Sequence, residues 1–343
     1  MDNLLIRVDG SYEIGIGHFM RSLALAQMWL KDRGNVYFLI NNNEYLKDRV
    51  KKEGMDYIIH YNKSGSIDDA NFLIKEVKKL NISWVIVDGY VFKEEYFNLI
   101  RNANIRYLIF DDKGELSYYN SNIILNQNLH GKKEYYDLKK ENYTKLLIGT
   151  KFTLLRNEFL KYINYKKNIK DKANNVLITL GGSDIKNYSL KILKILINID
   201  ISDLEVIVLV GANNPHFNEL QNYVNNINAN VKLLKSVLDM PEIMKWADLA
   251  FSSGGSTVWE LAFMGVPTIV GATSKAEEFL IKGLNDNNLF KTVGKLDNLN
   301  EKILENLFKE IIYSKKQREI MSQDGQIFVD GYGSKRVIDC MRK

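Results

Sequence analysis

The chain has 343 residues, of which 45% are hydrophobic and 26% charged, a composition typical of a globular protein with two domains of roughly 150–170 residues. Its net charge of +5 comes from scattered lysines rather than one basic block, which argues against nucleic acid as a partner and fits an anionic small molecule. A single cysteine, Cys340, excludes an internal disulfide. The sequence shows no signal pattern, and no apolar run approaches the ~20 residues that span a bilayer. We therefore predict a cytoplasmic protein without membrane insertion.

Strand-like and helix-like segments alternate through the first half of the chain. Short apolar strands are expected at residues 4–8, 36–40, 57–59, 84–88, 106–111 and 123–125. They are bounded by polar residues or glycine, as buried parallel strands are. A helix is expected after the first strand, because Phe19, Leu23, Ala26 and Leu30 recur on one face and Gly34 follows as a C-terminal stop.

The loop between the first strand and this helix is rich in glycine and contains Gly15, Gly17 and His18. The carboxyl edge of a parallel sheet is where α/β proteins place their chemistry. A dinucleotide fingerprint would need a third glycine, but Met20 stands there, and Asn41 occupies the region of the expected acidic residue. These departures argue against a nicotinamide cofactor.

His18 is one of only four histidines and sits where the loop becomes a helix. The positive end of the helix dipole disfavours an imidazolium there, and a neutral imidazole can take a proton from water. His18 is therefore a candidate general base, with a tight turn carrying an incidental histidine as the alternative. The other histidines lack such a context and are predicted to be ordinary surface or core residues: His60, His130 and His216.

Acidic residues end two further strands of this half. Asp88 precedes Gly89 and Tyr90, and Asp111 and Asp112 follow the next strand. A carboxylate pair suggests a cation, but no cluster of histidine or glutamate at ligand spacing accompanies it. We therefore expect neither a metal site nor a cofactor.

Residues 161–172 are charged and poor in apolar side chains, which indicates the end of a helix passing into an interdomain linker, with a solvated helix face as the alternative. A new series of strands and helices follows, with strands expected at residues 176–179, 204–210, 231–234, 249–252 and 268–270. Two consecutive parallel series predict an α/β protein with two Rossmann-like parallel-sheet domains facing across a cleft.

Two strands of the second series run into Gly-Gly-Ser loops that open helices. The free N–H groups and the dipole of a helix's first turn bind phosphate oxygens, and glycine lets an anion approach the backbone closely. One such loop is more often only a turn, but two at corresponding strand ends favour a diphosphate or nucleotide site. The loops comprise Gly181, Gly182, Ser183 and Asp184, before a helix from about Asn187, and Ser253, Gly254, Gly255, Ser256 and Thr257, before a helix that carries Glu260.

These segments together resemble the PseG/SpsG-type nucleotide-sugar proteins, a family that includes the UDP-2,4-diacetamido-2,4,6-trideoxy-β-L-altropyranose hydrolase of pseudaminic acid biosynthesis. The opening motif is the most specific: Arg7-x-Asp9-x-Ser11-x-x-Ile14-Gly15-x-Gly17-His18-x-x-Arg21. Further agreement follows in the same order at residues 110–112, 125–128, 154–159, 181–187, 253–260 and 329–337.

The family is similar to glycosyltransferases of the GT-B fold, such as the MurG type. The resemblance therefore implies a GT-B-like chain with an N-terminal Rossmann-like domain at residues 1–165, on the sugar and catalytic side. It also implies a nucleotide-binding domain at residues 166–325, and a C-terminal helix within residues 326–343 that crosses back to the N-terminal domain.

The resemblance further implies that a UDP-acetamido-deoxy sugar is hydrolysed to free sugar and UDP, in the biosynthesis of a pseudaminic-acid-like nonulosonate or a surface polysaccharide. His18 is then the base for water attack at the anomeric carbon with inversion, assisted by Asp9 or Tyr90, and Glu260 holds the ribose. The residues expected to bind substrate are Gly15, Gly17, Arg21, Gly181, Gly182, Ser183, Asp184, Asn187, Val237, Ser253, Gly254, Gly255, Ser256, Thr257 and Glu260.

The chain departs from the family after the strand at residues 268–270, where members often carry an Asn-Gln pair. Here Glu277 and Glu278 stand in the comparable stretch, and carboxylates near a diphosphate repel it unless they are turned away or paired. Two other functions stay open at this stage, a GT-B glycosyltransferase with a soluble acceptor and a non-catalytic nucleotide-sugar-binding protein. The oligomeric state stays open as well.

Overall fold

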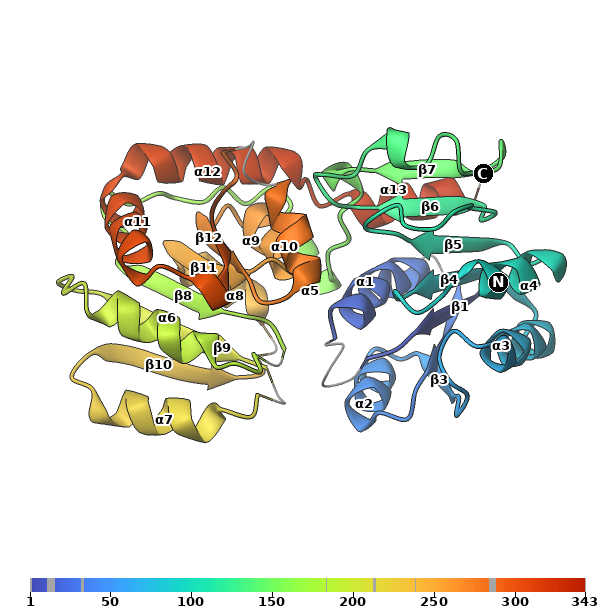
Figure 1. Cartoon of the computed structure of the whole chain (residues 1–343), viewed down its shortest axis with the longest axis horizontal. Coiled ribbons are helices and arrows are strands. Elements are labelled where there is room, and N and C mark those ends of the chain that lie inside the picture. Colours follow the sequence, from blue (N-terminus) through green and yellow to red (C-terminus); the bar gives the residue numbers. More distant parts are fainter. Residues whose placement is uncertain are drawn as a thin grey trace. The chain divides into compact units, whose positions relative to one another are not determined.

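The computed structural model describes residues 2–10, 16–31, 34–182, 184–211, 214–237, 239–283 and 288–342. The chain divides into two compact units (Figure 1). The first comprises Met1–Asn157 together with Gly331–Lys343, and the second comprises Glu158–Asp330. Each unit contains one sheet whose described strands are all parallel, so the predicted α/β class with two parallel-sheet domains is confirmed.

The sheet of the first unit has the strand order β3-β2-β1-β4-β5-β6-β7. Buried residues of α1, α2 and α13 pack against one of its faces and those of α3 and α4 against the other. The strands are β1 (Asn3–Val8), β2 (Asn35–Ile40), β3 (Asp56–Ile59), β4 (Ile82–Asp88), β5 (Tyr107–Phe110), β6 (Ile123–Asn126) and β7 (Lys145–Ile148). The helices are α1 (Gly17–Lys31), α2 (Glu44–Lys52), α3 (Ile67–Lys79), α4 (Glu94–Asn102) and α13 (Gly333–Met341), with short 3-10 turns η1 (Lys133–Tyr135) and η2 (Thr150–Phe152).

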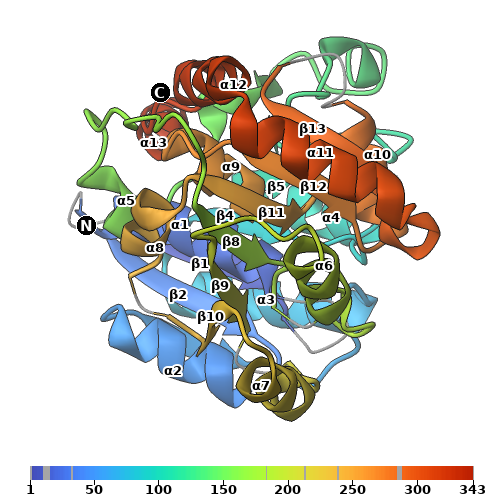
Figure 2. The same cartoon turned by 90° about the vertical axis from the view of Figure 1, so that its left-hand side faces the viewer.

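The sheet of the second unit has the strand order β10-β9-β8-β11-β12-β13. Buried residues of α6 and α11 cover one of its faces (Figure 2). The strands are β8 (Asn175–Thr179), β9 (Glu205–Val210), β10 (Asn230–Lys235), β11 (Leu249–Ser253), β12 (Thr268–Ala272) and β13 (Phe290–Lys295). The helices are α5 (Asn157–Leu160), α6 (Tyr188–Ile197), α7 (Phe217–Asn226), α8 (Met240–Trp246), α9 (Thr257–Phe263), α10 (Lys275–Lys282), α11 (Glu301–Tyr313) and α12 (Lys315–Phe328), with a 3-10 turn η3 (Leu296–Asn298).

Both sheets are wound outward from a central strand in two directions. In the first unit, β1 pairs with β2 on one side and with β4 on the other. In the second unit, β8 pairs in the same way with β9 and β11. This order is that of a doubly wound Rossmann sheet, which binds ligands at the carboxyl ends of the two strands where the winding reverses. The His18 loop follows β1, and the two Gly-Gly-Ser loops follow β8 and β11.

The last helix belongs to the first unit. Val337, Ile338 and Met341 of α13 share a core cluster with Phe19 and Leu23 of α1. The start of α13 lies very close to the main chain after η2, because a Cβ on Gly333 would come within 2.0 Å of the Thr153 carbonyl oxygen.

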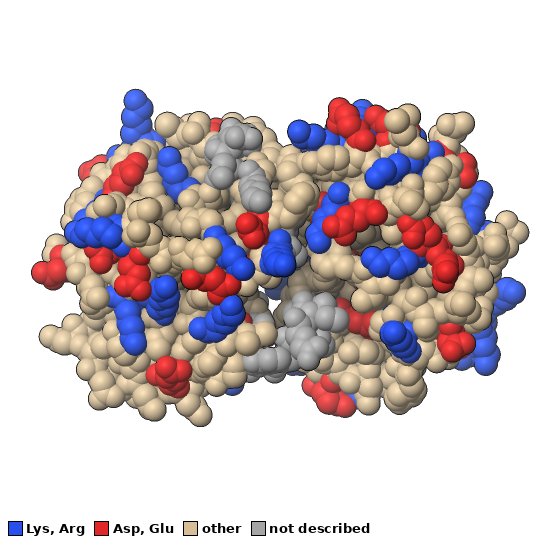
Figure 3. All heavy atoms as spheres, in the orientation of Figure 1, with Lys and Arg blue, Asp and Glu red and all other residues tan. Residues whose placement is uncertain are grey.

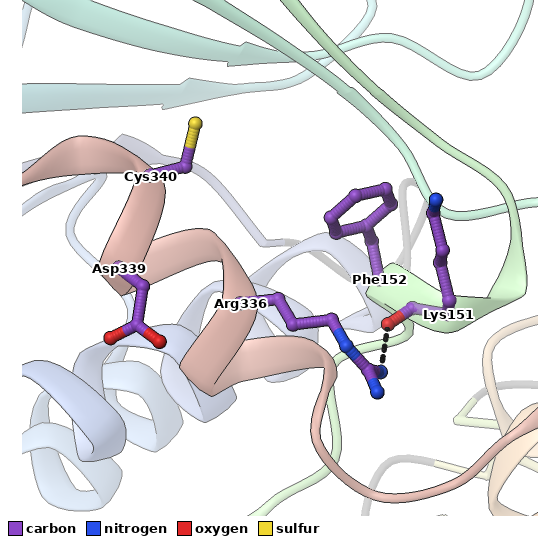
Figure 4. A pocket seen from close by; sticks show the side chains of 5 residues that line it. All are labelled: Lys151, Phe152, Arg336, Asp339 and Cys340. Carbon is purple, nitrogen blue, oxygen red and sulfur yellow. Dashed lines mark hydrogen bonds between the residues drawn. The ribbon is translucent and has the colours of Figure 1, made fainter. Parts of the chain in front are cut away.

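A small pocket lies between α13 and η2 (Figure 4). Arg336 donates a hydrogen bond to the Lys151 carbonyl at 2.8 Å there, beside Phe152, Asp339 and Cys340.

Charged side chains of both signs are interspersed over the face drawn in Figure 3, as expected from the scattered lysines. None of the helices in the described ranges combines the length and the apolar character needed to cross a bilayer.

Candidate active site

His18 is the second residue of α1, and its imidazole faces the last residue of β4. The Nδ1 atom lies 2.6 Å from Oδ1 of Asp88. The parallel register pairs Val8 at the end of β1 with Asp88, which brings the two loops together. An ionised carboxylate can only accept a hydrogen bond, so the Nδ1 atom that contacts it must carry the proton. The lone pair of the imidazole is then on Nε2. Nε2 is therefore the basic atom of this histidine.

The Asp88 carboxylate is fully buried and held by three further donors. Arg21 donates to its two oxygens at 2.7 Å through Nε and Nη2, and the Ser22 hydroxyl donates at 3.2 Å. Burial disfavours the charged form, but the positive charges of Arg21 and of protonated His18 outweigh it and hold the pKa of Asp88 well below its usual range. Asp88 is therefore charged at neutral pH and can stabilise an imidazolium at His18.

Tyr90 stands beside the imidazole. The two ring centroids are 4.7 Å apart at an interplanar angle of 86°, and the hydroxyl donates to Oδ2 of Asp112 at 2.9 Å. Burial and the charge of Asp112 raise the pKa of Tyr90, so the hydroxyl keeps its proton at neutral pH. The Lys113 ammonium lies 4.9 Å from the centre of the Tyr90 ring. The structure thus brings the predicted residues His18 and Tyr90 together.

Asp9 lies in a second cluster, beyond the end of β1. Its carboxylate accepts hydrogen bonds from Arg7 at 2.8 Å, Ser64 at 2.6 Å, His60 at 3.0 Å and the Asn41 backbone N–H at 3.0 Å. Burial disfavours its charge, but the bonds from His60 and Arg7 outweigh burial and hold the pKa of Asp9 well below its usual range. With its four donors, Asp9 fixes the segment that leads into the His18 loop.

Acid should destabilise the first unit through these carboxylates. The pKa values of Asp9, Asp88 and Asp112 are depressed in the folded state. Their contribution to the free energy of unfolding is therefore complete above the unfolded pKa of about 3.9 and is lost as the pH falls further toward the folded values. We expect urea midpoints of the first unit to fall steeply as the pH drops from about 4 toward about 2. A flat profile, or one that Asp9→Asn leaves equally steep, would contradict this assignment.

In the second unit the two Gly-Gly-Ser loops follow neighbouring strands. Thr179 of β8 pairs with Ser252 of β11, and a Cβ placed on Gly181 would lie 3.8 Å from the Ser253 hydroxyl. Gly181 has a φ of +80°, a conformation that favours glycine. The main chain of Gly182 also approaches the next strand end closely, since a Cβ on Gly211 would come within 2.1 Å of its carbonyl oxygen.

Two residues predicted to bind substrate have structural partners at the start of α6. The Asp184 carboxylate accepts hydrogen bonds at 2.8 Å from the backbone N–H groups of Tyr188 and Ser189, and burial raises its pKa. Asn187 donates to Glu219 at 2.8 Å. The first N–H groups of α6 are thus occupied by a side chain of the protein. Two other predicted residues, Gly15 and Ser183, lie outside the described ranges.

The second loop packs against α10, because a Cβ on Gly254 would lie 2.6 Å from Cγ2 of Ile281. Glu277 from that helix is paired, since its Oε2 accepts hydrogen bonds from the Thr273 backbone N–H at 2.7 Å and hydroxyl at 2.6 Å. Its Oε1 faces the loop, at 3.5 Å from where a Cβ of Gly255 would stand. One oxygen of the carboxylate that departs from the family pattern is therefore hydrogen-bonded to Thr273, just before α10, and the other faces the loop.

The remaining predicted residues lie near the same sheet edges. Gly17 begins α1, Ser256 precedes α9, Thr257 begins it, and Glu260 is half-buried within it. Val237 is half-buried and follows Ser236, which has a φ of 51° after β10.

Sequence reasoning missed the roles of Asp88 and Asp112 as partners of His18 and Tyr90, and it missed Asn128, which donates to Asp112 at 2.6 Å. A signal for Asp88 did exist. In a doubly wound sheet the first and fourth strands are neighbours, so a carboxylate ending the fourth strand comes beside the loop after the first.

Residues 175–324 match the family model described as the glycosyltransferase family 28 C-terminal domain. Three relatives span most of the chain. An uncharacterized protein of Methanocaldococcus jannaschii is 30% identical over 78% of this chain, which spans 55% of that protein. The spore coat polysaccharide biosynthesis protein SpsG of Bacillus subtilis is 24% identical over 97% of this chain and 95% of its own length. The UDP-2,4-diacetamido-2,4,6-trideoxy-β-L-altropyranose hydrolase of Campylobacter jejuni is 29% identical over 75% of this chain and 86% of its own length.

Among solved structures, MurG of Acinetobacter baumannii superposes with a TM-score of 0.70 at 14% identity, over 100% of this chain and 99% of that one. At this identity the likeness shows the fold, and it confirms the GT-B-like prediction. The chain is thus a GT-B-like α/β protein whose homologues include SpsG and the PseG-type UDP-2,4-diacetamido-2,4,6-trideoxy-β-L-altropyranose hydrolases.

Proposed function

We propose that the protein hydrolyses a UDP-acetamido-deoxy sugar of the UDP-2,4-diacetamido-2,4,6-trideoxy-β-L-altrose type to free sugar and UDP. The observation that carries this proposal is the His18–Asp88 pair, with Nδ1 bonded at 2.6 Å and Nε2 left as a base. The Campylobacter jejuni relative, named as a hydrolase of that UDP-sugar, supports the substrate class. The products would enter nonulosonate or surface polysaccharide biosynthesis.

In the proposed reaction, Nε2 of His18 takes a proton from water as the water oxygen attacks the anomeric carbon. The bond between that carbon and the diphosphate oxygen breaks, its electron pair leaves with UDP, and the anomeric configuration inverts. Asp88 stabilises the imidazolium that forms, and the neutral Tyr90 hydroxyl borders the site. General-base catalysis of this kind supplies about 10²–10⁴-fold in rate.

The second unit is proposed to hold the nucleotide. The backbone N–H groups of residues 253–257 can donate to the diphosphate, because α9 starts at Thr257 and glycines leave the main chain accessible. The Glu260 carboxylate is suited to accept hydrogen bonds from both ribose hydroxyls. The solved complex of MnaA from S. aureus with UDP has the same fold, with a TM-score of 0.69, and supports a nucleotide role.

Replacing Glu260 by alanine should weaken UDP binding about 10–100-fold, the effect expected when hydrogen bonds to a charged group are lost. Turnover at saturating substrate should change far less, because the reacting atoms do not touch this residue. Titration calorimetry with UDP measures the effect, with Glu301→Ala, an exposed glutamate at the start of α11, as the control. Equal UDP affinity in the Glu260 variant and the parent protein would refute the ribose role.

A glycosyltransferase is the second candidate, favoured by the family 28 domain match at residues 175–324. The same base would then deprotonate a sugar hydroxyl instead of water. Incubating the pure protein with the UDP-sugar and no acceptor separates the two. We expect UDP and free sugar to appear in equal amounts. An intact UDP-sugar that turns over only when a sugar acceptor is added would establish the transferase.

A further inference from the structure

Arg21 has its donors occupied by the protein. Its Nε and Nη2 atoms donate to Asp88 at 2.7 Å each, and its Nη1 donates to the two oxygens of Asp112 at 2.9 and 3.0 Å. The guanidinium also lies over the Phe110 ring, 4.6 Å from its centre, and the side chain is only 9% exposed. All three nitrogens of the guanidinium therefore donate to the two aspartates, and Nη2 also lies 3.0 Å from His18 Nδ1. The guanidinium is thus engaged by the two aspartates and buried, in place of the substrate contact expected from the sequence motif.

Asp112 is the second anchor of this arginine. Besides Arg21, its Oδ1 accepts a hydrogen bond from Asn128 at 2.6 Å, and its Oδ2 accepts one from the Tyr90 hydroxyl at 2.9 Å. The carboxylate is nearly fully buried. Burial disfavours its charge, but Arg21 and His18 outweigh burial and lower the pKa of Asp112. Asp112 is therefore an ionised group that fixes both Arg21 and Tyr90.

The contacts form one continuous chain, from Tyr90 through Asp112, Arg21 and Asp88 to His18. We propose that Arg21 is a positioning residue that couples the orientation of Tyr90 to the tautomer of His18 by bridging the two aspartates. The inference rests on the proposed role of His18 as the base, and it reassigns Arg21 from substrate binding to the support of that base.

The charges explain why the bridge matters. Two buried carboxylates and one guanidinium leave one negative charge beside a neutral imidazole, and proton transfer to His18 brings the sum to zero. Without Arg21, the two carboxylates would repel each other in a buried site, and one would take up a proton or turn away. Asp88 would then no longer hold the proton of His18 on Nδ1.

The planar fork of arginine is essential to this role. A guanidinium can bind two carboxylates at once along two edges, whereas a lysine ammonium is a single point of charge. Arg21→Lys therefore keeps the charge and removes the bridge. We expect kcat to fall about 10–100-fold, as when other partners that orient a reacting group are lost. The affinity for UDP should stay unchanged, because the nucleotide is assigned to the second unit.

The decisive readout is the imidazole itself. Nitrogen-15 NMR of the substrate-free protein should show His18 protonated on Nδ1, and Arg21→Lys should shift it toward a mixture of tautomers. Arg106→Lys, with its guanidinium over Trp84 on the same sheet, is the matched control and should change neither readout. Arg21→Ala, if it folds by circular dichroism, should regain part of its turnover when guanidinium or ethylguanidinium is added.

Two outcomes would overturn the coupling. One is an Arg21→Lys variant whose tautomer and kcat match the parent; the other is a variant whose KM rises while kcat is kept, which would return Arg21 to substrate binding. If Arg21→Lys does not fold, Asp112→Asn makes the same test, because the amide removes the charge that holds Arg21 and Tyr90. The tautomer is measured without substrate, so a parent protein that hydrolyses nothing would refute the proposed function while the NMR result still decides the coupling.

Discussion

Replacing His18 by alanine should lower turnover of the UDP-sugar by about 10²–10⁴-fold, the range over which a general base contributes. The loss should fall on kcat, because the variant keeps the loops of the second unit that are assigned to the nucleotide. UDP affinity by calorimetry should therefore be unchanged. The measurement is release of UDP at saturating substrate, compared between the variant and the parent protein.

Lys31→Ala is the control for this experiment, since it lies at the other end of α1 and is exposed. It should retain the activity of the parent protein. A His18→Ala variant with the turnover of the parent would remove His18 from the reaction. One that loses UDP affinity and turnover in proportion would show that His18 holds substrate instead of acting as a base.

Replacing Asp88 by asparagine is expected to reduce kcat by about 10²–10⁴-fold although the side chain keeps its shape, because a carboxylate that orients a histidine contributes on that scale. The amide has no charge to stabilise the imidazolium. It can also donate to Nδ1, which would move the lone pair away from Nε2. Turnover and the nitrogen-15 spectrum of His18 should both change.

Asp56→Asn is the control for Asp88→Asn, because it makes the same chemical change at another aspartate. Asp56 is exposed at the start of β3, on the same sheet, and its variant should behave as the parent does. An Asp88→Asn variant with parental kcat and an unchanged His18 tautomer would show that the 2.6 Å contact serves only to hold α1 in place.

Much of the fold could be predicted from the sequence, because buried parallel strands are short apolar runs. All the strands expected in both halves are present, with bounds that differ by one or two residues. Two strands of the structure, β7 and β13, were not predicted. They are edge strands of their sheets and include Lys145, Lys291 and Lys295. An edge strand needs no continuous apolar run and can leave little trace in the hydrophobic pattern, although the other two edge strands, β3 and β10, were predicted.

The candidate site was only partly predictable. A loop after the first strand drew attention to His18, and the helix dipole was the only electrostatic influence that the sequence made visible there. The partner that the structure adds is Asp88, 70 residues further along the chain, whose carboxylate accepts the hydrogen bond of the imidazole Nδ1. Arg21 was expected to bind substrate because it belongs to the opening motif that resembles the family, whereas its partners Asp88 and Asp112 are 67 and 91 residues away.

The second unit illustrates the same limit. The glycines at residues 181 and 254 were predicted to admit a phosphate. In the structure each position also favours glycine for a local reason, because Gly181 has a positive φ and Gly254 lies close to α10. Asp184 was expected to contact substrate, yet its carboxylate caps α6. Local spacing predicts where a loop lies, but the hydrogen-bond partners of a side chain depend on segments that the fold brings in from elsewhere.

The most direct test of hydrolysis by water attack at the anomeric carbon is a proton NMR and mass-spectrometric time course in ¹⁸O-water with the UDP-diacetamido-trideoxyhexose and no acceptor. We predict that UDP is released without label and that the free sugar carries ¹⁸O at its anomeric carbon, in the inverted configuration at the first time points. Label in the phosphate of UDP would place the cleavage at phosphorus, and an intact substrate would rule out hydrolysis; either result would contradict His18 as the base for attack at carbon.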